Sequence, residues 1–126
     1  MIQTSRLEIK NTVSLDLNDM YEYVSDKEVM KYEREDYPTK ESYAKVLNYL
    51  VEHKLLYSIR IKGHQKVIGH IYLGKTNPAI NNEYNLGHIL NPKYHNKGYC
   101  TEACRAVIDY GFSVLKANRV RAACNP

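Results

Sequence analysis

The segment with the clearest chemical potential is residues 86–103, LGHILNPKYHNKGYCTEA, in which a predicted strand leads through a short loop into a predicted helix. The loop contains Lys93, Lys97 and Gly98. The first amide groups of a helix have no intrahelical acceptor and carry a partial positive charge, and a glycine lets a phosphate approach the backbone. The pattern is compatible with an anion site, although a plain strand-to-helix connection is the more common meaning of such a loop.

Two cysteines follow in the same helix, Cys100 and Cys104, one helical turn apart and close to His95 in the sequence. A structural zinc site would need a second ligand pair at the usual spacing, and the sequence does not provide one. We therefore expect no metal and interpret both cysteines as small apolar residues that face a sheet. A thiol beside an anion site can have a lowered pKa, which would apply to Cys100.

The elements that hold this loop follow from the spacing of apolar residues. Alternating and helical patterns predict strands at residues 6–10, 56–62, 67–73, 83–90 and 119–124, and helices at 18–32, from 39 onward and at 101–116. The last helix joins two of these strands, which can lie parallel through a right-handed crossover. The predicted fold class is α/β (α+β), with a mixed, mostly antiparallel, twisted sheet and helices on both faces.

Single residues refine this prediction. Thr39 is the expected N-cap of the middle helix, and Asp26 that of a second short helix within 18–32. Gly69 inside a strand indicates a bulge or a close backbone approach. The apolar stripe of the last helix includes Val114 and also Gly111, which would let the helix lie close to the sheet.

Composition limits the class of protein. The chain has 126 residues, 44% hydrophobic and 25% charged, so we expect one domain over residues 1–126. It has no run of roughly 18 apolar residues that could cross a membrane, and its first residues do not resemble a signal peptide. The net charge is +4, but the basic residues are scattered, which argues against a nucleic-acid partner. Three cysteines indicate a reducing, cytoplasmic location.

Residues 95–100, His-Asn-Lys-Gly-Tyr-Cys, resemble the acetyl-CoA pyrophosphate loop of the GNAT superfamily of N-acetyltransferases. The family pattern is Gln or Arg, two residues, Gly, one residue, then Gly or Ala. Here His95 replaces the first residue, Gly98 matches, and Cys100 replaces the last. Residues elsewhere in the chain resemble the branch that includes ribosomal-protein alanine N-acetyltransferases: Thr4, Arg6, Leu7 and Ile9 at the start, then Asp26, Val29 and Tyr32.

The resemblance implies a GNAT-like fold that is incomplete at its C-terminus. Members of the family continue beyond this point with another helix and two strands, so we expect the sheet to lack the C-terminal helix and the last two strands. The predicted strand 119–124 would then be an open edge. We expect a second copy to pair there and form a homodimer.

The resemblance also implies transfer of an acetyl group from acetyl-CoA to a primary amine, either a protein N-terminus or a small amine. Backbone amides of residues 96–101 would hold the pyrophosphate. The pantetheine arm would lie along the strand like an added strand, and an amide near Ile89 would support the thioester oxyanion. The cofactor-binding residues implied in this way are His88, Ile89, Leu90, His95, Asn96, Lys97, Gly98, Tyr99, Cys100 and Thr101.

A base must take the proton of the attacking amine, and Glu83 is the candidate, acting directly or through water. The alternative interpretation is that Glu83 is an exposed carboxylate at a strand edge. His70 and His88 are other candidates, although a lone histidine in a strand is more often a hydrogen-bonded surface residue. The alternative function is an acyl-CoA-binding remnant without turnover, or a structural, dimerising fragment.

Overall fold

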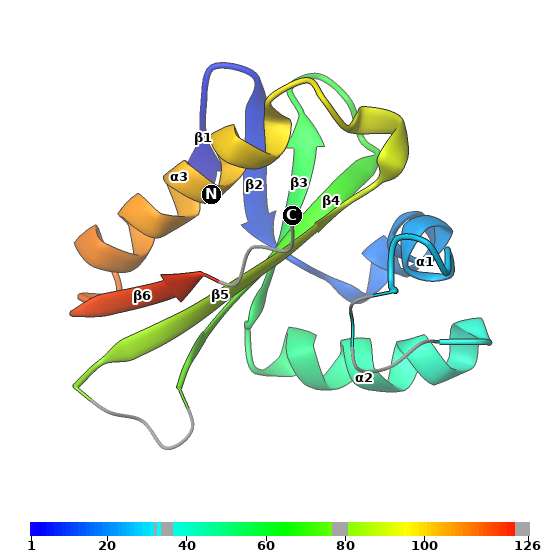
Figure 1. Cartoon of the computed structure of the whole chain (residues 1–126), viewed down its shortest axis with the longest axis horizontal. Helices are drawn as coiled ribbons and strands as arrows, with labels where there is room; N and C mark the ends of the chain where they lie inside the picture. The colour runs from blue at the N-terminus through cyan, green and yellow to red at the C-terminus, as the bar shows by residue number, and fades with distance from the viewer. Residues whose placement is uncertain (32, 34–36, 77–80, 123–126) are drawn as a thin grey trace.

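The chain folds around a six-stranded sheet whose strands follow one another in chain order (Figure 1). A computed structural model describes residues 1–31, 33, 37–76 and 81–122. All neighbouring strands in this part of the chain are antiparallel except β5 and β6, which are parallel, so the predicted mixed sheet is confirmed. The strands are β1 (Ile2–Gln3), β2 (Leu7–Asn11), β3 (Leu56–Ile61), β4 (Val67–Lys75), β5 (Glu83–Leu90) and β6 (Arg119–Ala122).

The strands agree with the predicted ones apart from their ends. β5 has the predicted bounds, β2 is shifted by one residue, and β4 is two residues longer than predicted. β1 was not predicted, because two residues are too few to show an alternating pattern. β6 is described as far as Ala122, so the predicted end of this strand at Cys124 lies outside the described residues, as does Tyr32.

Gly69 confirms the predicted irregularity in β4. Ile59 pairs with Gly69 while Arg60 pairs with Val67, so β4 has one extra residue at this point. A Cβ atom on Gly69 would lie 2.7 Å from the carbonyl oxygen of Ile89. The absence of a side chain therefore lets β5 approach β4 closely, just before β5 enters the loop.

The helices differ more from the prediction. The three helices in the described residues are α1 (Leu17–Val24), preceded by the 3₁₀ turn η1 (Ser14–Asp16), α2 (Lys40–Glu52) and α3 (Tyr99–Ser113). Thr39 caps α2 as predicted, since its Oγ1 accepts a hydrogen bond from the amide of Ser42 at 3.1 Å. The first part of the predicted helical span 18–32 is confirmed by α1, but the second short helix is wrong: Asp26 accepts from the amide of Glu28 at 2.9 Å in a turn and caps no helix.

The C-terminal end of α3 lies three residues before the predicted end, and its start lies two residues before the predicted start. Lys116 has a φ of +59°, and the amide of Ala117 donates to the carbonyl of Gly111 at 2.9 Å. The left-handed residue turns the chain away from the helix axis, so α3 ends here. Val114 lies beyond this end and is 58% exposed, so its predicted place in the apolar stripe is wrong.

The helices cover both faces of the sheet, as predicted: α3 lies on one face, and α1 and α2 lie on the other (Figure 1). A Cβ atom on Gly111 would meet Leu73 at 3.6 Å, an ordinary contact, so the packing of α3 does not require this glycine. Among the described residues, no helix is long and apolar enough to cross a membrane. The core beneath α3 includes Leu7, Ile9, Ile59, Ile71, Leu86, Ala103 and Val107, and the core beneath α1 and α2 includes Met20, Tyr23, Val24, Tyr43, Leu47 and Leu56.

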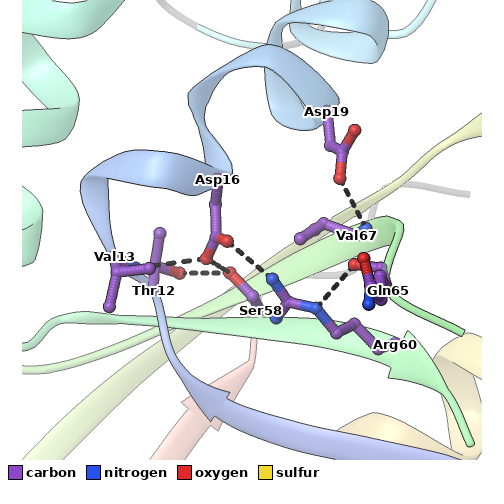
Figure 2. Close-up of polar contacts among 8 residues, drawn as sticks. All are labelled: Thr12, Val13, Asp16, Asp19, Ser58, Arg60, Gln65 and Val67. Carbon is purple, nitrogen blue, oxygen red and sulfur yellow. Dashed lines mark hydrogen bonds and ion pairs between the residues drawn. The ribbon is translucent and has the colours of Figure 1, made fainter. Parts of the chain in front are cut away.

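A buried carboxylate fixes α1 over the hairpin of β3 and β4. Asp16 accepts hydrogen bonds from the hydroxyl of Ser58 at 2.9 Å and from Nη2 of Arg60 at 2.6 Å (Figure 2). One helical turn further, Asp19 accepts from the amide of Val67 at 3.0 Å, at the start of β4. The carboxylate of Asp16 is only 3% exposed, and these hydrogen bonds compensate for its burial. Together with the contact of Asp19 they fix the start of α1 against β3 and β4.

Candidate functional site

The predicted strand, loop and helix are all present, and Asn91, the first residue of the loop, anchors the loop to the sheet. β5 ends at Leu90, a single 3₁₀ turn, η2 (Pro92–Tyr94), follows, and α3 begins at Tyr99. Asn91 is buried at the junction: its amide donates to the carbonyl of Ile68 at 2.8 Å, and its Oδ1 accepts from the amide of Lys93 at 3.1 Å. The start of the loop is therefore fixed to β4.

Gly98 shapes the N-terminus of α3. It has a φ of +81°, in the left-handed region that favours glycine, and its carbonyl accepts the first helical hydrogen bond, from Glu102 at 3.1 Å. In the described part of the chain, the amides from Gly98 to Thr101 donate to no side chain and to no backbone carbonyl. A Cβ atom on Gly98 would lie 3.2 Å from a guanidinium nitrogen of Arg6. The turn thus presents uncommitted donors and leaves little room for a side chain.

Arg6 holds this turn from the opposite end of the chain. Its Nη1 donates to the carbonyl of Lys97 at 2.9 Å, and its guanidinium lies 4.5 Å from the centre of the Tyr99 ring. Its Nε forms an ion pair of 2.7 Å with Glu102, which also accepts a hydrogen bond from the hydroxyl of Thr4. All contacts from Arg6 use carbonyl, carboxylate or ring acceptors, so they leave the amides of the turn unused.

Glu102 lies in the first turn of α3, where an acidic residue interacts favourably with the helix dipole, and it also binds Thr4 and Arg6 from the start of the chain. Desolvation raises the pKa of its carboxyl, but hydrogen bonds from Thr4 and Arg6 outweigh this effect and lower the pKa overall. In the sequence, Thr4 and Arg6 stand out only as part of a family pattern. No local signal could show that their partner lies almost a hundred residues away.

A second carboxylate joins the loop to α1 on the other side. Glu22 accepts a hydrogen bond from the side chain of Asn91 at 2.5 Å and forms ion pairs with Lys66 at 3.0 Å and Lys93 at 3.8 Å. The hydrogen bond with Lys66, followed by that with Asn91, lowers the pKa of Glu22. Glu22 was not predicted as a site residue, because its partners come from two parts of the chain that are distant from it, the β3–β4 turn and the loop after β5.

Beneath the start of α3, a histidine meets the two cysteines. Nδ1 of His88 lies 3.1 Å from Sγ of Cys100, which lies 4.0 Å from Sγ of Cys104. The hydrogen bond with Cys104 is the main cause that lowers the pKa of the Cys100 thiol; burial opposes this shift and His88 adds to it. Both cysteines do pack against the sheet as predicted, but their contact with His88 was not predicted.

Of the candidate bases, His70 and His88 lie near each other on the paired strands β4 and β5, and Glu83 lies at the other end of β5. The Nδ1 atom of His70 is 2.7 Å from the hydroxyl of Tyr23 in the core, and burial, with a smaller effect of His88, lowers the pKa of His70 to about 4. Glu83 begins β5 and forms long ion pairs with two arginines of β6, at 3.7 and 3.9 Å. At about 3.3 Å per residue, Glu83 lies roughly 20 Å along the strand from Ile89. The structure therefore does not bring Glu83 next to the predicted oxyanion position.

A polar pocket of about 680 Å³ opens beside α1, between β2, β3 and the turn that joins β3 to β4. None of the site residues predicted from the sequence lines it. Its lining carries charges of both signs, and Figure 2 shows Asp16, Asp19 and Arg60 among them, with the neutral Gln65 beside Arg60. The lining residues are Glu8, Lys10, Leu15, Asp16, Asp19, Arg60, His64, Gln65 and Lys66.

The mixed sheet with a glycine turn at the start of α3 is the arrangement of an acetyltransferase, and comparison with known proteins agrees. The family model described as the acetyltransferase (GNAT) domain matches residues 6–126, so the chain belongs to the GNAT acetyltransferase family and is an acetyltransferase enzyme. It is 34% identical over 130 residues to an uncharacterized N-acetyltransferase, YnaD, of Bacillus subtilis, covering 99% of this chain and 73% of the relative.

Solved structures give the same result. A GNAT-family acetyltransferase from Bacillus anthracis has a TM-score of 0.89 and 34% identity, with coverage of 99% of this chain and 74% of that one. A spermidine N-acetyltransferase from Vibrio cholerae, solved with CoA and spermine, has a TM-score of 0.80 and covers 94% of this chain and 71% of that one. Its identity to this chain is 18%, so it supports the fold alone. Transfer from acetyl-CoA is the general reaction of the family.

Proposed function

We propose that this protein transfers the acetyl group of acetyl-CoA to a primary amine and that the turn at Gly98 binds the diphosphate of the coenzyme. The observation that carries this proposal is the set of amides from Gly98 to Thr101, which have no acceptor in the described part of the chain. Such donors at a helix N-terminus suit an anion.

The pantetheine arm would bind to the edge of β5. The pairing of β5 with β4 continues to Leu90, whereas its described pairing with β6 runs only from Glu83 to Leu86. The main-chain groups of His88 and Ile89 would then be available to an extended ligand, which adds to a sheet edge as a strand does. The carbonyl of Leu90 already accepts a hydrogen bond from Nε2 of His95 at 2.9 Å. An amide near Ile89 would support the oxyanion of the thioester.

In the reaction, the neutral amine attacks the thioester carbonyl carbon, the C–S bond breaks and CoA departs as a thiolate. A thiol has a pKa near about 8.5, so this leaving group does not depend on a strong general acid. The enzyme contributes mainly by holding the amine and the carbonyl together. Glu83 remains the predicted acceptor of the amine proton, and its distance along β5 means that the proton would travel through several water molecules.

Two lines of support point to two kinds of amine acceptor. The resemblance to the ribosomal-protein alanine branch favours a protein N-terminal amine, and the fold is shared with a spermidine acetyltransferase. An assay panel should therefore hold peptides with N-terminal Ala or Ser, spermidine, and an amino sugar. Release of free thiol from acetyl-CoA in the presence of one amine supports the proposal, whereas no release with any of them favours a binding remnant without turnover.

Two glycines allow a matched test of the diphosphate turn. Gly98 and Gly63 have φ values of +81° and +82°, so a valine is strained at both positions. Gly63 lies in the β3–β4 turn with no other atom within 4 Å of its Cβ position. Calorimetry should show that Gly98→Val weakens acetyl-CoA binding by at least about tenfold and that Gly63→Val binds as the wild type does. Equal weakening in both variants would contradict the proposal.

We also propose that two copies pair through β6, as predicted from the sequence. In the described residues, β6 pairs with β5 alone, and an unpaired strand edge is a template for a second copy. Light scattering over a range of concentrations should reach twice the mass of the chain. A mass that stays at that of one chain throughout would exclude the dimer.

A further inference from the structure

Three side chains with soft or borderline ligand atoms converge between β5 and the first turns of α3. His88 Nδ1, Cys100 Sγ and Cys104 Sγ all lie within 4.8 Å of one another, and all three residues are half-buried. The contacts between them are short, at 3.1 Å from His88 to Cys100 and 4.0 Å between the two sulfur atoms. The spacing along the chain predicted no metal here, because it offers no second ligand pair. The third ligand instead comes from the neighbouring strand.

The spacing of the cysteines favours a metal over a disulfide. Side chains four residues apart on a helix have Cβ atoms about 5–6 Å apart, whereas a disulfide needs about 3.5–4.5 Å. The same spacing is well suited to two ligands of one metal ion, as in helices that bind zinc through residues four apart. Cys100 and Cys104 can therefore share a cation without any change in α3, but they cannot form a disulfide without distorting it.

We propose that His88, Cys100 and Cys104 bind a thiophilic divalent cation, with Zn²⁺ as the best match. Thiolate and imidazole ligands suit Zn²⁺ and disfavour Mg²⁺ and Ca²⁺, which prefer oxygen. Three protein ligands leave one coordination position for water or another small ligand. The bound cation would join β5 to the first turns of α3, directly beneath the turn at Gly98.

This inference does not rest on the proposed function. The cation would use side chains that face α3 and the sheet, whereas the proposed diphosphate contacts use backbone amides from Gly98 to Thr101. A variant can therefore lose one property and keep the other. Gly98→Val is expected to weaken acetyl-CoA binding and to retain metal binding, so failure of either proposal can be recognised separately.

The test uses Co²⁺ as a spectroscopic substitute for Zn²⁺. The chain has three cysteines, and Cys124→Ser provides a background in which only Cys100 and Cys104 can supply thiolates. Reduced, chelator-treated protein should bind one equivalent of Co²⁺ with a thiolate-to-cobalt absorption band, and Zn²⁺ should abolish that band. Absence of the thiolate band, or binding of Mg²⁺ with equal strength, would overturn the proposal.

Single substitutions locate the site. Cys104→Ala and His88→Gln should each weaken Co²⁺ binding by at least about tenfold, whereas His53→Gln, a change at the exposed end of α2, should leave it unchanged. Circular dichroism checks that each variant is folded. Unchanged binding by folded Cys104→Ala would overturn the proposal.

A measurement on the parent protein covers the case in which the variants fail to fold. Zn²⁺ should raise its melting temperature, because a ligand that binds only the folded state stabilises it. Zn²⁺ should also slow alkylation of Cys100 and Cys104, identified by peptide mass. Alkylation at the same rate with and without Zn²⁺ would contradict the site.

Discussion

Arg6 and Glu102 form an ion pair of 2.7 Å although 96 residues separate them in the chain. The pair joins the segment before β2 to the first turn of α3. Because Arg6 also donates to the carbonyl of Lys97 and lies over the ring of Tyr99, one side chain sets the position of the whole glycine turn. The geometry of the proposed diphosphate site therefore depends on a residue far from it in sequence.

Replacement of Arg6 by Ala should weaken acetyl-CoA binding more than it weakens the fold. The Arg6 side chain is 44% exposed, so loss of its ion pair should reduce stability by about 1 kcal/mol or less. Loss of its three contacts to the turn should raise the Kd for acetyl-CoA about tenfold. Calorimetry and thermal unfolding measure the two effects.

Arg6→Lys separates charge from geometry. Lysine keeps the positive charge but lacks the planar guanidinium group, which contacts two acceptors and a ring at once. This variant should therefore resemble Arg6→Ala in binding. Lys31→Gln removes an exposed ion pair with Glu28 in the segment after α1 and serves as the control. An Arg6→Lys variant with wild-type affinity would show that charge alone matters.

Glu83→Gln tests the predicted proton acceptor. If the carboxylate takes the proton of the amine, kcat should fall about 10²-fold at neutral pH while acetyl-CoA affinity is unchanged. Because Glu83 also pairs with Arg119 and Arg121, a double variant of both arginines to Gln controls for the loss of these contacts. A kcat equal to that of the wild type would remove Glu83 from the mechanism.

His70 should make the fold sensitive to acid. Its pKa is lowered to about 4 in the folded chain from about 6.5, so the contribution of neutral His70 is complete above pH 6.5 and is lost as pH falls toward 4. In this window the unfolded chain binds a proton that the folded chain does not. The free energy of unfolding should therefore fall by up to ~1.4 kcal/mol per pH unit.

Urea unfolding of the wild type and of His70→Gln between pH 7 and pH 5 measures this slope. The variant should be less stable at pH 7, because Tyr23 loses its partner, but its stability should change less with pH. His53→Gln, at the exposed end of α2, should keep the wild-type slope. Equal slopes for the wild type and His70→Gln would show that His70 is not the titrating group.

Gly69→Ala should destabilise the protein where Gly87→Ala should not. A Cβ atom at Gly69 would lie 2.7 Å from the backbone oxygen of Ile89, whereas at Gly87 the nearest atom would be 4.0 Å away. Backbone cannot move as a flexible side chain can, so we expect a loss of about 1–3 kcal/mol for Gly69→Ala. Denaturant unfolding compares the two; similar values for both variants would contradict the close approach of β4 and β5.

The sequence by itself determined the elements whose signals are local. Alternation predicted β3, β4 and β5, the Thr39 cap and an apolar stripe predicted α2, and a second apolar stripe predicted α3 apart from its ends. In each case the decisive interactions lie within one turn or between neighbouring residues. Such interactions leave a periodic pattern in the chain.

Only the tertiary structure decided the end of α1, the short strand β1 and the contacts that complete the site. Arg6 with Glu102, Glu22 with Lys66, and His88 with the two cysteines all join parts of the chain that are distant in sequence. Their proximity depends on how helices pack on the two faces of the sheet. Residue spacing does not record that packing, because a local period fixes which side of an element is buried but not which side chains meet across it.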